Sequence, residues 1–371
     1  MVKKRKYLFQ DEAKALGIKP KENEPGRNQA RYIIKEQQWQ NVLEARNLGI
    51  LEAHKEHGVD HTQSKFLWLK SKNSSIPVQN PFFKPEKQKQ FEELKDELIE
   101  DLKTYSPKFP KLKREASNES QLLVIDPADV HIGKLSDAFE TGTEYNSQIA
   151  VQRVKDGVKG ILNKARGVNI DKILFVGGND ILHTDTPKRC TTSGTPQDTD
   201  GMWYRNFLMA KDLYIEVLEI LIGIADVHFV FNPSNHDYTN GFFLANVIET
   251  YFRNCKNITF DCSIAHRKYF RYHNNIIGTT HGDGAKQDNL PLLMATESKD
   301  YSECTKRYIY THHLHSKRYA DYPGVTIEVL RSPSEADSWH HRNGYQHAPV
   351  AIEAFLHHKQ FGQETRITHH F

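Results

Sequence analysis

The sequence has few cysteines, no long apolar run and little net charge, and each of these features excludes a class of protein. Its four cysteines show no Cys-x-x-Cys spacing, which argues against a disulfide framework or a zinc knuckle. No run approaches about 18 apolar residues, so no membrane-spanning helix is expected. The segment MVKKRKYLFQDEAK has basic residues without an apolar stretch behind them. We therefore expect no signal peptide and a cytoplasmic protein.

The composition is that of a folded protein with an uneven distribution of charge. Hydrophobic residues make up 38% and charged residues 26% of the 371 residues, enough for one large domain with an appendage or for two domains. Residues 1–120 hold 24 Lys and Arg against 18 Asp and Glu, whereas the remainder holds 26 against 29. A basic front beside an acidic remainder suits a polyanionic substrate, although a mixed solvated surface explains the charge equally well.

The first third of the chain differs in pattern from the rest. Apolar spacing predicts helices within residues 30–57 and 91–102. Residues 65–72, KFLWLKSK, interleave lysines with aromatic side chains, a mixture found in proteins that bind single-stranded nucleic acid. We therefore predict a mainly helical, basic region at residues 1–115 that contacts nucleic acid, followed by a second domain at residues 116–371.

Beyond residue 120, short apolar runs alternate with amphipathic segments, which predicts an α/β layered domain. The runs typical of buried strands are QLLVI, KILFVGG, VHFVFNP, NIIGTTHG and RYIYTHH. Apolar side chains at helical spacing predict helices within 146–165, 207–224 and 243–251, and Asn146 or Ser147 is expected to cap the first. After residue 325, TIEVL and APVAIEAFL follow as strands without helices and are expected to complete a second sheet.

Polar side chains that could bind metal follow five of these apolar runs. The carboxyl ends of strands line the functional crevice of open α/β sheets, so five such clusters in succession point to one site. A carboxylate there would be costly to bury unless a cation lay beside it. Residues i and i+2 of an extended chain point the same way, so Asp129 with His131, and His313 with His315, should each aim two ligands at one spot. The clusters are Asp129-Val130-His131, Asn179-Asp180 with His183, Asn235-His236-Asp237, His281-Gly282-Asp283 and His313-Leu314-His315.

The ordered segments DVH, GGNDILH, SNHD, THG and HHLH, within residues 121–316, resemble the pattern of calcineurin-like metallophosphoesterases. The resemblance implies a four-layer α/β/β/α sandwich, in which two mixed sheets are flanked by helices, for a catalytic domain at residues 116–371. Ser234 and His312 depart from the family pattern, since each stands where glycine is usual. The implied ligands are Asp129, His131, Asp180 and His315 for one metal, and Asp180, Asn235, His281 and His313 for the other.

The resemblance also implies a mechanism that depends on two divalent metal ions. Oxygen and imidazole ligands suit Mn²⁺, the expected ion, with Fe, Zn²⁺ and Mg²⁺ as alternatives. A hydroxide held between the ions would attack the phosphorus. His236 would donate a proton to the leaving oxygen, and His183 would stabilise the phosphoryl oxygens. Asp237 is a candidate to orient His236, with a surface ion pair as the alternative. Lys188 and Arg189 are candidates to bind the phosphate backbone, with a solvated loop as the alternative.

The residues after Asp180 indicate a branch of this family. Asp180-Ile181-Leu182-His183 is similar to the Gly-Asp-Leu-Phe-His element of double-strand-break repair nucleases of the SbcD type, and it lacks the arginine of the phosphoprotein phosphatases. The insert TDTPKRCTTSGTPQDTDGMW resembles phage-borne members of this group. The implied protein is an exonuclease or endonuclease acting on single- or double-stranded DNA in a bacterium or a phage-infected host cell. By analogy it would have a coiled-coil ATPase partner, and the sequence leaves a homo-oligomer open.

Two other functions fit the same residues. A phosphomonoesterase, or a small-molecule or cyclic-nucleotide phosphodiesterase, would use them on another substrate. A non-catalytic nucleic-acid-binding module with a structural metal centre would need the ligands but not His236. Several remaining histidines, including His340, are expected at the surface or in packing contacts, and Trp339 is expected in the core rather than as a platform for base stacking.

Overall fold

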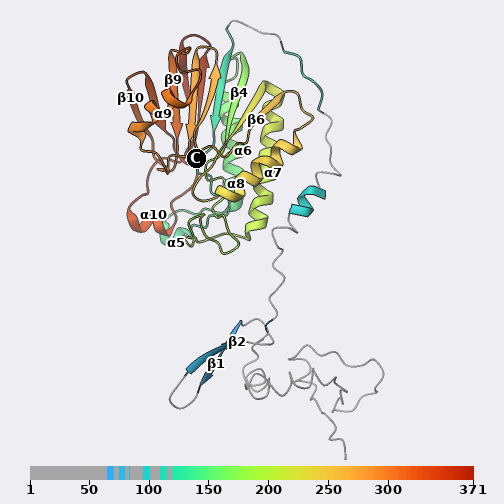
Figure 1. Ribbon diagram of the computed structural model, residues 1–371, viewed down its shortest axis with the longest axis vertical. Helices are drawn as coiled ribbons and strands as arrows, with labels where there is room; N and C mark the ends of the chain where they lie inside the picture. Colours follow the sequence, from blue (N-terminus) through green and yellow to red (C-terminus); the bar gives the residue numbers. More distant parts are fainter. Residues whose placement is uncertain (1–64, 71–74, 80–82, 84–94, 101–108, 115–118) are drawn as a thin grey trace, which may run out of the picture. The chain divides into compact units, whose positions relative to one another are not determined.

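The computed structural model describes residues 65–70, 75–79, 83, 95–100, 109–114 and 119–371 (Figure 1). The chain divides into two units, Met1–Ile99 and Glu100–Phe371. The domain boundary predicted between residues 115 and 116 stays a prediction, because 115–118 lie outside the described ranges. The helices predicted within 30–57 lie outside them as well.

The described part of the first unit contains an antiparallel hairpin. Its strands are β1 (Phe66–Lys70) and β2 (Ser75–Gln79), and Phe66 pairs with Gln79. The stretch that interleaves lysines with aromatic residues therefore includes a strand, within a region predicted to be mainly helical. Residues 95–100 are helical, as the apolar spacing predicts for 91–102. The remaining residues of that prediction, 91–94 and 101–102, lie outside the described ranges.

The larger sheet of the second unit has six strands in the order β13-β12-β3-β4-β5-β6. The strands from β3 to β6 are parallel, and β12 pairs antiparallel with both β3 and β13. The central strands are apolar and buried over most of their length, because both faces of the sheet are covered. The bounds are β3 (Gln121–Asp126), β4 (Ile170–Gly178), β5 (Asp226–Asn232), β6 (Ile258–Asp261), β12 (Ala351–His358) and β13 (Gly362–His370).

The smaller sheet has five strands in the order β10-β11-β9-β8-β7. The three inner strands β8, β9 and β11 are parallel, and the edge strands β7 and β10 are antiparallel to their neighbours. The bounds are β7 (Lys268–Tyr272), β8 (Asn275–Thr280), β9 (Lys306–Thr311), β10 (Arg318–Tyr322) and β11 (Val325–Val329).

Helices cover the outer faces of both sheets (Figure 1). The helices α6 (Ser147–Lys164), α7 (Trp203–Ile224) and α8 (Tyr238–Tyr251) pack against the six-stranded sheet. The short η2 (Gln287–Asn289) leads into α9 (Leu290–Glu297), which packs against the five-stranded sheet. Among the described residues, no helix combines the length and the apolar character that crossing a membrane requires.

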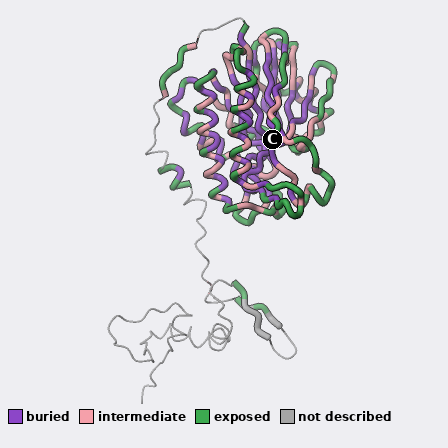
Figure 2. Tube along the Cα trace, turned by 180° about the vertical axis from the view of Figure 1, so that it is seen from behind, coloured by how far each residue is buried: buried purple, intermediate pink, exposed green. Residues whose placement is uncertain are grey.

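The main core lies between the two sheets. Leu122, Val124 and Leu174 of the larger sheet pack against Ile277 and Tyr310 of the smaller one, and all five are buried. Figure 2 shows buried residues running through the middle of this unit, with exposed residues on the outside of its helices and loops. The order of layers is therefore helix, sheet, sheet, helix, which confirms the predicted four-layer α/β/β/α architecture.

The first predicted helix begins as its sequence indicates. The side chain of Asn146 accepts a hydrogen bond from the backbone N–H of Ile149 (3.0 Å). This bond satisfies one of the backbone donors that have no partner within the first turn of a helix. Asn146 is thus the N-cap of α6, one of the two residues proposed from the sequence.

Two expectations for the last third of the chain are wrong. β12 joins the six-stranded sheet beside β3, whereas only β11 joins the smaller one, because an apolar strand does not reveal its partner. The region after residue 325 also contains a helix, α10 (Ser338–Asn343). The Asp337 side chain accepts from the His340 N–H (2.9 Å), and Gly344 ends the helix with a φ of 74°. Six residues are too few to show an apolar period.

Candidate metal centre

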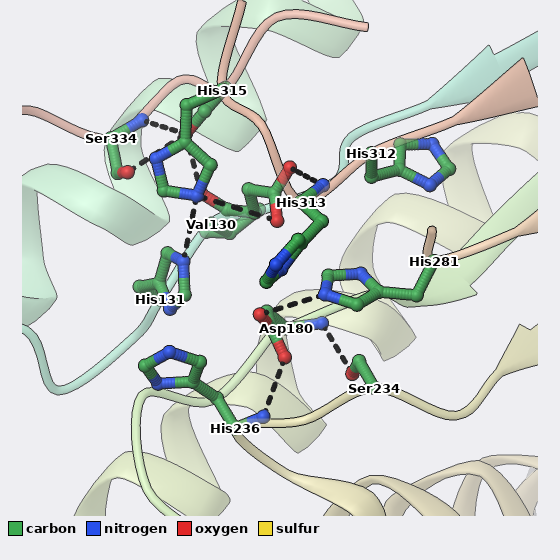
Figure 3. Close-up of polar contacts among 12 residues, drawn as sticks. Val130, His131, Asp180, Ser234, His236, His281, His312, His313, His315 and Ser334 are labelled. Carbon is green, nitrogen blue, oxygen red and sulfur yellow. Dashed lines mark hydrogen bonds and ion pairs between the residues drawn. The ribbon is translucent and has the colours of Figure 1, made fainter. Parts of the chain in front are cut away.

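The predicted clusters lie where strands of both sheets end. Asp180 and His281 come within two residues of the ends of β4 and β8, and Asp129, Asn235 and His313 within three residues of the ends of β3, β5 and β9. Parallel neighbours end at the same edge of a sheet, which explains how clusters far apart in the sequence meet. Figure 3 shows a common space around Asp180, from which the ring of His312 points away; the imidazoles that face this space are those of His131, His236, His281, His313 and His315.

The backbone at these clusters is left-handed rather than extended. The φ angle is 53° at Asp129, 50° at His131, 60° at Asp180, 70° at His313 and 50° at His315. Asp129 and His131 converge as predicted, but through left-handed turns and not through extended chain, whereas His313 and His315 belong to different donor groups. Left-handed residues other than glycine are unfavourable by about 1–3 kcal/mol each and persist where surrounding contacts hold them, often at functional sites.

Hydrogen bonds hold these turns against one another. The N–H of Asp129 donates to the carbonyl oxygen of Asn179 (2.8 Å), and the N–H of His131 donates to that of Asp180 (2.9 Å). The N–H of His313 donates to Oδ2 of Asp129 (3.0 Å). Because His313 follows a strand of the smaller sheet and Asp129 one of the larger, the last bond joins the two halves of the site.

Asp129, His131 and His315 form a first donor group, whose ligand atoms all lie within 4.8 Å of one another. Nε2 of His315 is 3.2 Å from Nε2 of His131 and 3.5 Å from Oδ1 of Asp129 (Figure 3). That carboxylate oxygen is buried without a hydrogen-bond partner among the described residues. Burial lowers the pKa of both imidazoles, so their neutral forms can offer lone pairs. These donors fit a divalent metal ion.

Asp180, His281 and His313 form a second donor group, again within 4.8 Å. Nε2 of His281 is 3.1 Å from Oδ2 of Asp180 and 3.0 Å from Oδ1 of Asn235. Burial lowers the pKa of His281, but the Asp180 carboxylate outweighs it and the resulting pKa is about 9. Burial raises the pKa of the Asp180 carboxyl, but the neighbouring His281 and His236 hold this pKa well below its usual value. This group attracts positive charge, which a metal ion would supply.

His131, His183 and His236 form a third group, which shares His131 with the first. The rings of His183 and His236 stack with centroids 5.2 Å apart, and the His131 ring is 4.7 Å from that of His236. Nδ1 of His236 donates to the carbonyl oxygen of His183 (2.9 Å), which leaves Nε2 to exchange a proton. Burial and the neighbouring His236 lower the pKa of His183. Both residues predicted to act on the phosphate therefore lie beside the first donor group.

The Asp237 carboxylate does not bond to the His236 imidazole; it stabilises the turn that carries Asp180. Its Oδ1 accepts from the Ser234 hydroxyl (2.6 Å), and its Oδ2 accepts from the Leu182 N–H (2.9 Å). Ser234 Oγ in turn accepts from the N–H of Asp180 (2.7 Å). Burial and the Asp180 carboxylate raise the pKa of Asp237 to about 8. Neither the orienting contact nor the surface ion pair expected from the sequence matches this buried position.

Lys134 is a residue near the site that the sequence reasoning missed. It is fully buried, and its Nζ lies 3.3 Å from Oδ2 of Asp337. The other oxygen of Asp337 accepts from Nδ1 of His340 (2.6 Å), whose ring stacks on that of His315 with centroids 5.1 Å apart. A lysine three residues after His131 is a visible signal, but nothing in the sequence places His340 against His315.

The residues expected to bind the phosphate backbone, Lys188 and Arg189, are exposed in the loop between β4 and α7. Nη2 of Arg189 lies 3.8 Å from Sδ of Met202, at the end of this loop. The structure thus leaves both side chains in contact with solvent. Trp339 is also 60% exposed, so the expectation that it lies in the core is wrong.

Comparisons with known proteins gave matches among solved structures only; no protein-family model and no curated protein matched the sequence. An archaeal phosphodiesterase is 8% identical with a TM-score of 0.32, and the match covers 67% of this chain and 99% of that one. Zinc-complexed Vps29 from Entamoeba histolytica is 10% identical, with a TM-score of 0.29 and coverage of 67% and 98%. A predicted phosphoesterase from Streptococcus pneumoniae is 11% identical, with a TM-score of 0.26 and coverage of 68% and 98%. Such distant likenesses do not bear on function, so the chemistry of this chain rests on its own side chains.

Proposed function

We propose that this chain is a calcineurin-like metallophosphoesterase that uses two divalent metal ions to hydrolyse phosphodiester bonds of DNA. The observation that carries the proposal is the convergence of two donor groups, each of which combines a carboxylate that follows the larger sheet with at least one imidazole that follows the smaller sheet. A structural metal site is usually closed by its ligands. Here His183 and His236, which are not in the predicted ligand sets, lie against the first group, as an active site requires.

The donors divide into two metal sites. Asp129, His131 and His315 would hold one ion, and Asp180 would reach both. When bound, such ions neutralise charge on the phosphoryl oxygens and make a water molecule more acidic. The donor groups contain no cysteine, and their mixture of oxygen and imidazole donors favours Mn²⁺, with Fe, Zn²⁺ and Mg²⁺ as alternatives. The second ion would be held by Asp180, Asn235, His281 and His313.

His236 and His183 would handle the proton and the phosphate. With Nδ1 of His236 donating to the His183 carbonyl oxygen, Nε2 of a protonated His236 is the atom that would donate to the leaving oxygen. The His183 imidazole, stacked beside it, would donate to a non-bridging phosphoryl oxygen. Hydrogen bonds from a ring fixed in this way are directed before substrate arrives, which lowers the barrier most effectively.

Specificity for DNA is supported by the sequence of the site and by the charge around it. Asp180-Ile181-Leu182-His183 is similar to the corresponding element of the SbcD-type nucleases. The exposed Lys188 and Arg189 would bind the backbone phosphates. We further propose that residues 116–371 form the catalytic domain and that residues 1–115 contact the nucleic acid.

The first experiment measures metal content and hydrolysis on the full chain. We expect two equivalents of Mn²⁺ per chain by elemental analysis, and cleavage of end-labelled single- or double-stranded DNA. A phosphomonoesterase would instead hydrolyse nucleoside monophosphates faster than DNA, and a small-molecule phosphodiesterase would cleave bis(p-nitrophenyl) phosphate or a cyclic nucleotide but not DNA. Two bound ions without hydrolysis of any of these compounds would favour the binding module.

Variants separate the catalytic residues from the ligands. Asp180→Ala should lose both metal and activity. His236→Asn and His183→Asn should each keep the metal and lower kcat by about 100-fold or more. His273→Asn is the matched control, because His273 is exposed in the turn between β7 and β8, away from the donor groups, and asparagine tolerates its φ of 50°. If His236→Asn retained wild-type kcat, the proposed role of this residue as a general acid would be wrong.

A further inference from the structure

Two large aromatic side chains remain exposed on and after α10. Trp339 is 60% exposed and Tyr345 is 66% exposed. Their ring centroids lie 5.7 Å apart with the planes tilted by 40°. Large aromatic rings usually bury most of their apolar area, so a pair that stays in water is typical of a surface that binds something.

This aromatic pair is continuous with the metal centre. The Trp339 ring meets the His340 ring edge to face, with centroids 5.1 Å apart, and the His340 ring stacks on His315 at the same 5.1 Å. Two ring contacts therefore separate the indole from the first donor group. A nucleotide whose phosphate lies at that group would have its base within reach of Trp339.

The helix that carries Trp339 is held in place by contacts below it. The buried Lys134 pairs with Asp337, which caps α10 and accepts from the His340 ring. The Ser338 hydroxyl donates to Oε1 of Glu140 (2.6 Å), in the short helix α5 (Ala138–Thr141) that lies next to α10 in Figure 1. A platform fixed before binding loses little conformational entropy when a ligand stacks on it.

A positive charge lies on the same helix as Trp339, on the side away from the start of the helix where Ser338 contacts Glu140. Arg342 lies one helical turn after Trp339, so the two side chains project from neighbouring positions of α10. Arg342 is exposed and forms no ion pair among the described residues. Exposed aromatic rings next to an unpaired cation are the combination with which proteins bind single-stranded nucleic acid.

We infer that Trp339 and Tyr345 form a stacking platform for an unpaired nucleobase, so that the substrate presented to the metal centre is single-stranded nucleic acid. This inference rests on the proposed function, because the adjacent donor groups are what would hold the phosphate. Arg342 binds a flanking phosphate. A base within a duplex has both faces covered by its neighbours and cannot stack on the platform without leaving the helix.

The test compares two single strands of equal length that differ only in their bases. Oligothymidylate and a strand of abasic residues carry the same phosphates, so stacking alone separates them. Both are fluorescently labelled and titrated with the full, metal-reconstituted chain carrying His236→Asn, which limits turnover. Trp339→Ala should weaken binding of oligothymidylate by about 5- to 100-fold and leave binding of the abasic strand unchanged. Tyr345→Ala should act in the same direction.

Two further variants guard against an unspecific effect. Trp339→Phe retains a ring and should bind oligothymidylate within a few-fold of the parent protein. Phe361→Ala is the matched control, because Phe361 is 63% exposed but lies in the turn between β12 and β13, at the end of the sheet opposite the metal centre. It should leave both affinities unchanged.

The outcomes distinguish this inference from the proposed function. If Trp339→Ala leaves oligothymidylate binding unchanged, or weakens binding of both strands equally, the platform is wrong even where the wild type cleaves DNA. Equal effects of Trp339→Ala and Phe361→Ala would also overturn it, as would a surface that binds a protein or a membrane but shows no dependence on bases. A base-dependent loss in a chain that hydrolyses no phosphodiester would support the platform and count against the enzyme.

Discussion

Ser234 and His312, which stand where the metallophosphoesterase pattern has glycine, add polar contacts. Ser234 accepts from the N–H of Asp180 and donates to Asp237, so its hydroxyl links the turn that carries Asp180 to the start of α8. Nε2 of His312 lies 2.9 Å from Oδ1 of Asp126, and its Nδ1 lies 3.2 Å from the carbonyl oxygen of Thr280. Glycine would supply neither contact. Each substitution thus adds a buried polar link beneath the donor groups.

His357 makes stability depend on pH at a position far from the metal centre. It is fully buried, with Nε2 2.9 Å from the hydroxyl of Tyr310, and burial lowers its pKa from 6.5 to about 3. Because the unfolded state binds a proton more readily, this contribution to stability is complete above pH 6.5 and is lost as the pH falls towards 3.

Replacing His357 should therefore flatten the acid limb of the stability profile. Between pH 6 and 4, the free energy of unfolding of His357→Gln should fall less steeply than that of the wild type, by up to about 1.4 kcal/mol per pH unit. Urea unfolding at a series of pH values measures the slope. His341→Gln, at an exposed position, should keep the wild-type slope. An unchanged slope in His357→Gln would show that this imidazole is protonated in the folded state.

At the scale of elements, the end of β4 depends on close approach of the backbone. Gly178 has a φ of 76°, and a Cβ there would lie 2.3 Å from the carbonyl oxygen of Asn232, its partner on β5. Only glycine permits both the left-handed conformation and this contact. The turn that presents Asp180 therefore requires a residue without a side chain two positions earlier.

A pair of alanine substitutions separates these two effects. Gly167 also has a positive φ, 90°, but nothing lies within 4 Å of a Cβ built there. Gly167→Ala should lose about 1 kcal/mol of stability from backbone strain alone. Gly178→Ala should lose at least 2 kcal/mol more, because the Asn232 carbonyl must move. Equal losses in urea unfolding would mean that the β4–β5 contact adjusts freely.

Two kinds of element are described least well by the sequence pattern: short helices, and strands that are buried on both faces. In α10 the visible signals were the capping Asp337 and the terminating Gly344, which together span too few residues to show a helical period. β12 was recognised as a strand, but its burial on both faces fits either sheet. Its place beside β3 follows from pairing between residues far apart in the chain.

At the scale of the whole molecule, both donor groups join the two sheets. Asp129 and His131 follow a strand of the larger sheet and His315 one of the smaller; Asp180 and His281 are divided in the same way. A metal ion bound by either group would thus connect the sheets directly. Binding to the folded state alone stabilises it in proportion to the logarithm of ligand concentration.

Metal binding should accordingly raise the thermal stability of the chain. At a Mn²⁺ concentration about 1,000 times the dissociation constant, the gain should be about 4 kcal/mol, seen as a higher Tm that reverses with a chelator. Asp129→Ala combined with Asp180→Ala should abolish the rise. Asp212→Ala, on the exposed side of α7, is the matched control and should show the full rise. The same rise in the double variant would place the metal elsewhere.

The sequence by itself determined the alternation of strands and helices, the N-cap of α6 and the positions of the polar clusters, because these depend on residues close together in the chain. It also indicated which side chains could be ligands, since carboxylates and imidazoles at strand ends are recognisable one cluster at a time. Only the tertiary structure divided neighbours such as His313 and His315 between two donor groups, because left-handed turns, not extended strands, direct them. It alone brought Lys134 and His340 to the site and left Trp339 in solvent, because those positions depend on packing between segments that no local pattern relates.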